Sequence, residues 1–206
     1  MSAWCVLDSQ AGANASSVLR RGCTVVVLYD AQYQERWTAL VMLELLEQLF
    51  RQVRAYTQAE RYDRKQVYSR NSAHNSKHVT MQFDRDAEDI LIKGLEDSNL
   101  GFEVISEERP TFTTAPTPSY RIIIDPIDGS TNVERGIMTA AVALAVLPID
   151  APVVPEQVQW ALVGELFSGI VYEAQSGGGA FRNGRRCQTS TTTGLHNCLA
   201  GVNLDG

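Results

Sequence analysis

The sequence predicts a layered α/β (α+β) protein in which helices pack on a sheet. Two segments, 32–64 and 84–99, carry apolar side chains at three- and four-residue steps, as amphipathic helices do. Short apolar runs alternate with these segments, and residues 122–124 are three consecutive isoleucines, which is typical of a strand buried on both faces. Alternation of helices and strands is the pattern from which layered α/β folds are built.

The overall composition is that of a globular protein with an acidic surface. The chain has 206 residues, enough for one substantial core or two small ones, and 44% of them are hydrophobic. Its formal net charge is −6 and it has no basic stripe, so we do not expect a nucleic-acid backbone as partner. A small phosphorylated substrate is compatible with this charge if metal ions neutralise the site locally.

The cysteines and histidines show no spacing typical of a metal site or a disulfide framework. We expect free thiols, structural zinc is not indicated, and the histidines are assigned to the surface or to loops. The residues concerned are Cys5, Cys23, Cys187, Cys198, His74, His78 and His196. No apolar run approaches the roughly 20 residues of a membrane span. We do not expect a secretory signal at the N-terminus, and an organelle transit peptide is the weaker alternative there. We therefore expect a cytoplasmic protein without membrane contact.

The chain divides into an uncertain N-terminal extension, residues 1–31, and the main domain, residues 32–206. Within the extension, residues 24–29 have the composition of a strand. The helix expected over 32–64 has an apolar stripe whose members are Trp37, Leu40, Val41, Leu45, Leu46, Leu49, Val53 and Tyr56. We expect this stripe to face the core, the alternative being a partner interface.

A second helix is expected after a polar loop at 70–77 and a short extended piece at 79–83. Asp84 is the expected N-cap, and acidic residues follow it in the first turn, where the helix dipole favours negative charge. Asn99 and Gly101 can adopt positive φ and are expected to end the helix. Residues 102–106 then predict a strand, and the proline- and threonine-rich segment 109–119 predicts a loop.

The strand at 122–124 is expected to stop at Pro126, because proline cannot donate to a sheet ladder. Downstream, residues 139–147 predict a further strand, closely covered by helices. Segments 158–166 and 169–174 predict a hairpin, and residues 180–186 predict another around the Asn183–Gly184 turn. The three glycines at 177–179 lack the Gly-Lys-Ser/Thr of a P-loop.

Asp125 and Asp128 flank the turn at Pro126 and form a candidate metal site. Two neighbouring carboxylates repel each other, and a bound divalent cation removes that conflict. Mg²⁺ prefers such oxygen ligands. Gly129, Ser130 and Thr131 follow directly, with N–H groups and hydroxyls of the kind that hold phosphate. The alternative is an ordinary turn, since Asp-Pro and Asp-Gly are common turn dipeptides.

Four ordered motifs resemble the inositol monophosphatase family, whose superfamily includes fructose-1,6-bisphosphatases and 3′-phosphoadenosine 5′-phosphate phosphatases. Residues 79–88, V-T-M-Q-F-D-R-D-A-E, are similar to the family's T-x-x-D-x-x-A-E, and I-S-E-E at 105–108 is similar to G-E-E. I-D-P-I-D-G-S-T-N at 124–132 matches D-P-[IL]-D-G-[ST]-x-N. Residues 171–184 resemble the family's glycine-rich Asn-Gly hairpin. The resemblance implies the N-terminal portion of a layered αβαβα sandwich of the sugar phosphatase type.

The resemblance also implies roles for individual residues. Glu107, Asp125, Asp128 and the backbone carbonyl of Ile127 would bind metal, and Asp84 would hold a further, weaker metal or its water. Ser130, where the family more often has threonine, would act with Glu107 to orient the attacking water. The catalytic set implied is therefore Glu107, Ser130 and Asp84. The N–H groups of Gly129, Ser130 and Thr131 would hold the phosphate at the start of a short helix.

The resemblance further implies Mg²⁺-dependent, lithium-sensitive hydrolysis of a phosphate monoester, with inositol monophosphate the leading substrate. A fructose bisphosphatase or nucleotide 3′-phosphatase is the nearest alternative, and a non-catalytic metal-binding or dimerisation protein is the alternative from another class. Dinucleotide binding is not indicated, because no G-x-G-x-x-G follows a strand. The family's later W-D-x-A-A/G motif is absent, so we expect a fragment or an inactive homologue. A lone half should expose apolar surface and aggregate or form a homodimer.

Overall fold

The computed structural model describes residues 5–7, 18–21, 24–27, 31–60, 82–194 and 196, with side chains described over 37–59, 82–194 and 196. The expected loop at 70–77, the extended residues 79–81 and the C-terminal residues 197–206 lie outside this part. His74, His78, Cys23 and Cys198 also lie outside it. Within it, Cys187 is a free thiol and His196 is exposed, as expected.

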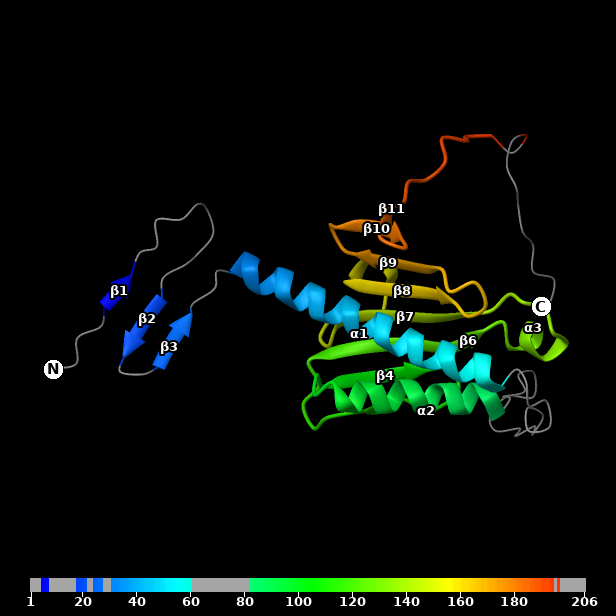
Figure 1. Ribbon diagram of the computed structural model, residues 1–206, viewed down its shortest axis with the longest axis horizontal. Coiled ribbons are helices and arrows are strands. Elements are labelled where there is room, and N and C mark those ends of the chain that lie inside the picture. Colours follow the sequence, from blue (N-terminus) through cyan, green and yellow to red (C-terminus); the bar gives the residue numbers. More distant parts are fainter. Residues whose placement is uncertain are drawn as a thin grey trace.

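An eight-stranded mixed sheet forms the main body, with strand order β11-β10-β9-β8-β7-β6-β4-β5 (Figure 1). β4 and β6 are parallel and every other neighbouring pair in this sheet is antiparallel. The strands are β4 (Phe102–Ser106), β5 (Phe112–Thr113), β6 (Tyr120–Asp128), β7 (Ala141–Pro148), β8 (Trp160–Glu165), β9 (Val171–Gln175), β10 (Gly179–Arg182) and β11 (Arg185–Arg186). A separate three-stranded sheet comprises β1 (Cys5–Leu7), β2 (Val18–Arg21) and β3 (Thr24–Val27).

Two long helices, α1 (Ala31–Glu60) and α2 (Gln82–Asp97), cover one face of the main sheet (Figure 1). α1 packs on β7, β8 and β9, and α2 packs on β6 and on α1. The Tyr56 hydroxyl donates to Asp86 Oδ2 at 2.7 Å and joins the two helices. The remaining helical elements are α3 (Ser130–Arg135) and the 3₁₀ turn η1 (Pro155–Gln157). The predicted fold class, a layered α/β protein, is therefore confirmed.

The sheet is not buried on both faces as the isoleucine run predicted. Burial alternates along β6, where Ile122 and Ile124 are buried and Ile123 is half-buried. The same alternation along β7 and β8 shows that, in the described part of the chain, one face packs on helices and the other is partly open. That alternation is the pattern of a sheet with a single helical cover.

The core-facing stripe of α1 differs at its N-terminal end from the one predicted. Trp37, Leu40 and Val41 are 54%, 60% and 44% exposed, because this end of the helix does not pack on the sheet. The buried side chains further along are Met42, Leu46, Leu49, Phe50 and Val53. Periodicity identifies the apolar stripe of a helix, but it does not show how far a sheet extends beneath it.

Several local predictions are confirmed. The strand at 102–106, the strand over 139–147 and both downstream hairpins are present. Asn183 and Gly184 have φ of 48° and 73°, as a two-residue hairpin turn requires. Asn99, just after α2, has φ of 56°. The predicted loop at 109–119 is interrupted by the short strand β5, which pairs with the edge of β4.

Among the described residues, no helix is both long and apolar enough to cross a membrane. The expected cytoplasmic location, the absence of nucleic-acid contact and the homodimer stay predictions. So does the division of the chain at residue 31.

Candidate active site

A β-bulge in β6 places Asp125 and Asp128 on the same face of the sheet. Asp125 pairs with Ala143 of β7 and Asp128 pairs with Ala141, so three steps along β6 match two steps along β7. The extra residue reverses the normal alternation, which would have sent side chains three apart to opposite faces. The expectation that Pro126 ends the strand is wrong: β6 continues to Asp128, and proline is accommodated at the bulge.

Glu107 follows the neighbouring parallel strand at the same edge. Ser106, the last residue of β4, pairs with Ile124, so Glu107 comes next to Asp125 along the ladder. Burial raises the pKa of Asp125, and the negative charges of Glu107 and Asp128 add to this rise, which brings it to about 6. The backbone amide of Ile127 opposes the rise. Glu107 and Asp128 are thus each close enough to disfavour the charged form of Asp125.

Asp84 and Ser130 form a second cluster on the helix-covered side. Asp84 is only 2% exposed, and the Ser130 hydroxyl lies 2.8 Å from its Oδ1 and 2.9 Å from the Ile127 carbonyl oxygen. A hydroxyl has one proton, so it donates to one of these acceptors at a time. The structure thus shows a direct contact between Ser130 and Asp84, and the predicted role of Ser130 with Glu107 in orienting water stays a prediction.

The expectation that Asp84 caps its helix is wrong. α2 begins at Gln82, so Asp84 lies inside the first turn, where its charge still favours the helix dipole. From this position its side chain reaches Ser130 at the start of α3. Asp84 and Asp125 therefore approach the site from opposite faces of β6, because Asp125 follows the helix-facing Ile124.

The segment after the bulge starts the short helix α3. Gly129 has φ of 97°, a conformation that favours glycine, and a Cβ there would meet the Thr139 carbonyl oxygen at 3.0 Å. The Asn132 side-chain amide donates to the same carbonyl at 3.0 Å and closes the turn. No side chain caps α3, so its first N–H groups are not satisfied by a capping side chain. This is the arrangement expected of a phosphate-binding turn.

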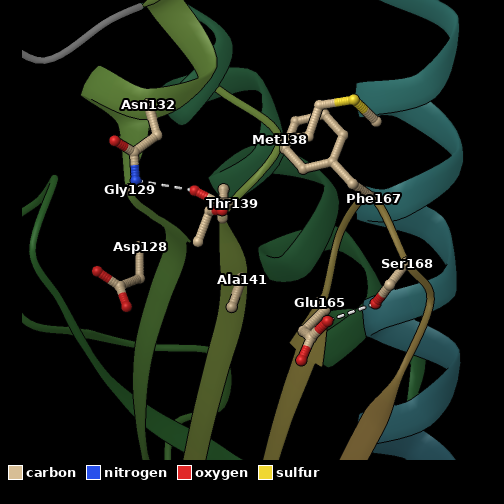
Figure 2. A pocket seen from close by; sticks show the side chains of 10 residues that line it. Asp128, Gly129, Asn132, Met138, Thr139, Ala141, Glu165, Phe167 and Ser168 are labelled. Carbon is tan, nitrogen blue, oxygen red and sulfur yellow. Dashed lines mark hydrogen bonds between the residues drawn. The ribbon is translucent and has the colours of Figure 1, made fainter. Parts of the chain in front are cut away.

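A pocket of about 290 Å³ opens beside these residues (Figure 2). Its floor is a cross-strand row, Asp128, Ala141 and Glu165, in which each residue pairs with the next. The small Ala141 side chain leaves room between the two carboxylates. The Ser168 hydroxyl donates to Glu165 Oε2, and Met138 and Phe167 form an apolar wall.

Sequence reasoning did not identify Glu165, Ser168 or Asn132 as site residues. Glu165 is a single acidic residue in an otherwise apolar strand, and nothing in its local sequence separates it from a solvated surface charge. Its place in the site depends on the β7–β8 register, which aligns it with Asp128 across Ala141. Only strand pairing reveals that relation.

The donor set suits a hard divalent cation. Carboxylate and carbonyl oxygens are the ligands that Mg²⁺ prefers. Burial is the main cause of the raised pKa of Asp125, and the charges of Glu107 and Asp128 add to it, so a bound cation would relieve the cost of the charged form. In the portion of the chain with described side chains, no three His, Cys, Asp or Glu side chains are gathered closely enough to hold a metal as they stand. Glu107 and Asp128, two of the predicted ligands, are both exposed.

A mixed sheet under two helices, with acidic residues at the end of the parallel pair β4–β6, has the architecture of a sugar-phosphatase-type α/β fold. The described part supplies the first helical layer and the first sheet of that sandwich. The chain belongs to the inositol monophosphatase family, whose model matches residues 38–204.

Individual relatives agree with this assignment. A fructose-1,6-bisphosphatase/inositol-1-monophosphatase from Thermococcus kodakarensis is 35% identical over 112 residues, 54% of this chain and 40% of the relative. An inositol-1-monophosphatase from Mesorhizobium japonicum is 32% identical over 131 residues, 60% of this chain and 44% of the relative. The chain thus spans under half the length of these two curated relatives.

Solved structures show the same fold. The Thermotoga maritima IMPase superposes with a TM-score of 0.62 at 24% identity, covering 76% of this chain and 57% of that one. The extragenic suppressor protein suhB from Bartonella henselae superposes with a TM-score of 0.63 at 22% identity, covering 73% and 55%.

Proposed function

We propose that this chain carries the metal- and phosphate-binding half of a Mg²⁺-dependent phosphomonoesterase, with inositol monophosphate as the leading substrate. The observation that carries the proposal is the bulge that puts Asp125 and Asp128 on one face of β6, next to Glu107. A divalent cation bound among these carboxylates at the strand end would offset the cost of keeping half-buried Asp125 charged beside Glu107 and Asp128.

Glu107, Asp125, Asp128 and the Ile127 carbonyl would hold Mg²⁺, and Asp84 would hold a second, weaker ion or its water. Bound Mg²⁺ in such a site supplies charge neutralisation at phosphate and an acidified water. The Ser130 hydroxyl, which lies 2.8 Å from Asp84 Oδ1, would orient the attacking water. The N–H groups of Gly129, Ser130 and Thr131 would hold the phosphate oxygens at the uncapped start of α3.

The pocket beside Asp128 would hold the alcohol part of the ester. Its carboxylate oxygens accept hydrogen bonds, which suits a polyol, and Met138 and Phe167 offer an apolar wall to the C–H groups of a sugar or cyclitol ring. Ser168 fixes Glu165 in position for such contacts. Glu165 would then contribute to substrate choice without binding the metal.

Two other functions remain as alternatives. Fructose-1,6-bisphosphatase activity is favoured by the names of two archaeal relatives, from Thermococcus kodakarensis and Pyrococcus furiosus, at 35% and 34% identity. A non-catalytic metal-binding homologue is the alternative from another class. By the family resemblance, lithium should inhibit an active enzyme.

Release of inorganic phosphate tests the proposal directly. The purified chain is incubated with inositol 1-phosphate, fructose 1,6-bisphosphate or 3′-phosphoadenosine 5′-phosphate, in Mg²⁺ or in EDTA. We expect release only in Mg²⁺, loss of release in Asp128→Asn, and normal release in the exposed control Asp150→Asn. Release that persists in EDTA or in Asp128→Asn contradicts the proposed site. Mg²⁺ binding without release from any ester supports the non-catalytic alternative.

A further inference from the structure

Arg109 joins α2 to the turn that carries Glu107, and its contacts with Glu88 and Asp89 are together called the clamp. The Arg109 guanidinium donates through Nε to Glu88 Oε2 and through a terminal nitrogen to Asp89 Oδ1. Glu88 and Asp89 belong to α2, whereas Arg109 lies two residues beyond Glu107 in the turn after β4. The contact therefore ties together two segments that are about twenty residues apart in sequence.

The clamp is anchored in the protein interior. The Glu88 side chain is 0% exposed, Arg109 is 36% exposed and Asp89 is 63% exposed. A buried carboxylate is costly unless it is paired, so Glu88 holds Arg109 strongly, and Asp89 adds a weaker surface contact. Burial raises the pKa of Glu88, and the Ser106 hydroxyl and the Arg109 charge oppose that rise.

The clamp connects the two elements that carry the proposed metal ligands. Glu88 lies one turn after Asp84 and shares the buried face of α2 with it. On the other side, the Glu108 N–H donates to Ser106 Oγ at 3.2 Å and shapes the turn in which Glu107 sits. Glu107 itself is exposed, so its position depends on the residues that anchor this turn.

We propose that Arg109 is a positioning residue: by binding Glu88 and Asp89 it fixes the turn that presents Glu107 to the metal. This inference rests on the metal centre of the proposed function. If the turn is already ordered, less conformational entropy is lost when Glu107 binds the cation, so the affinity for the metal is higher. Residues that orient a metal ligand typically change metal affinity by about 10- to 100-fold.

Two variants weaken the clamp without removing its buried anchor. Arg109→Lys keeps the positive charge but loses the planar fork that contacts both carboxylates. Asp89→Asn removes only the charge of the exposed partner. The matched control is Arg121→Met: Arg121 pairs with Glu103 and donates to the Ala151 carbonyl at 2.8 Å, and neither contact involves the turn.

The affinity for Mg²⁺ alone is measured by calorimetric titration of the purified chain, and amide hydrogen exchange of residues 106–109 is measured in EDTA. We expect Arg109→Lys to weaken Mg²⁺ binding about tenfold and to speed exchange in the turn. Asp89→Asn should change both in the same direction by less. Arg121→Met should lower Tm and leave both readouts at the wild-type level, which separates positioning from general stability.

Each result bears on the two proposals differently. Wild-type Mg²⁺ affinity in Arg109→Lys overturns the positioning role and leaves the metal centre standing. Equal losses of affinity in Arg109→Lys and Arg121→Met also overturn it, because they would reflect stability alone. If the wild-type chain binds no Mg²⁺, the metal centre and the positioning role both fail, and hydrogen exchange alone then decides whether Arg109 orders the turn.

Discussion

Replacing Asp125 by asparagine should make the metal-free chain more stable at neutral pH. Burial, together with the charges of Glu107 and Asp128, raises the pKa of Asp125 from an ordinary 3.8 to about 6 in the folded state. The folded state therefore binds this proton more tightly than the unfolded state does. Stability contributed by this group is greatest below about pH 4 and falls as the pH rises towards about 6.

The size of the effect follows from the shift. A rise of about two pKa units corresponds to roughly 3 kcal/mol, at about 1.4 kcal/mol per unit. Asp125 is partly exposed, so solvent screening reduces this figure, and we expect a penalty of about 1–2 kcal/mol above pH 6. The asparagine side chain carries no charge, so Asp125→Asn should recover this free energy of unfolding at pH 7.5 and recover little at pH 4.

Urea unfolding in EDTA at the two pH values measures the difference, with exposed Asp150→Asn as control. The same experiment in Mg²⁺ should reverse the order, because the wild type gains stability by binding the ion and the variant loses a ligand. The reasoning fails if Asp125→Asn is less stable than wild type at pH 7.5 in EDTA. It also fails if the gain is the same at pH 4.

Further predictions concern the site and the core. Ser130→Ala should lower Mg²⁺-dependent turnover and cost about 1–2 kcal/mol of stability, since buried Asp84 loses a hydrogen bond; activity and urea unfolding measure these. Glu165→Gln should raise KM for a polyol phosphate more than it lowers kcat, in steady-state kinetics. Gly164→Ala should lower stability by about 1–3 kcal/mol, because its Cβ would overlap the Phe50 ring; a lower Tm checks this.

Strands with strong local signals were predictable from the sequence. The isoleucines of β6, the β-branched and apolar residues of β4 and the Asn183–Gly184 turn each restrict the backbone where they stand. The order of four motifs was enough to predict the family, which the match over residues 38–204 confirms. In the candidate site, sequence identified the residue types and their order along the chain.

Contacts between distant segments were not predictable in the same way. The N-terminal end of α1 has the same apolar periodicity as the rest, yet Trp37 and Leu40 are exposed because, in the described part of the chain, no strand lies beneath them. Phe50 is buried because Gly164 of β8 leaves space for its ring. That complementarity involves residues far apart in the sequence.

By itself, the sequence determined which side chains are available at the ends of strands and helices. Acidic residues there suit a cation, and a glycine and hydroxyls suit a phosphate. Tertiary structure decided how they face one another. A single extra residue in the β6–β7 register puts Asp125 and Asp128 on one face, and the packing of α2 joins Asp84 to Ser130. Strand register and helix packing are set by the whole core, so no local pattern specifies them.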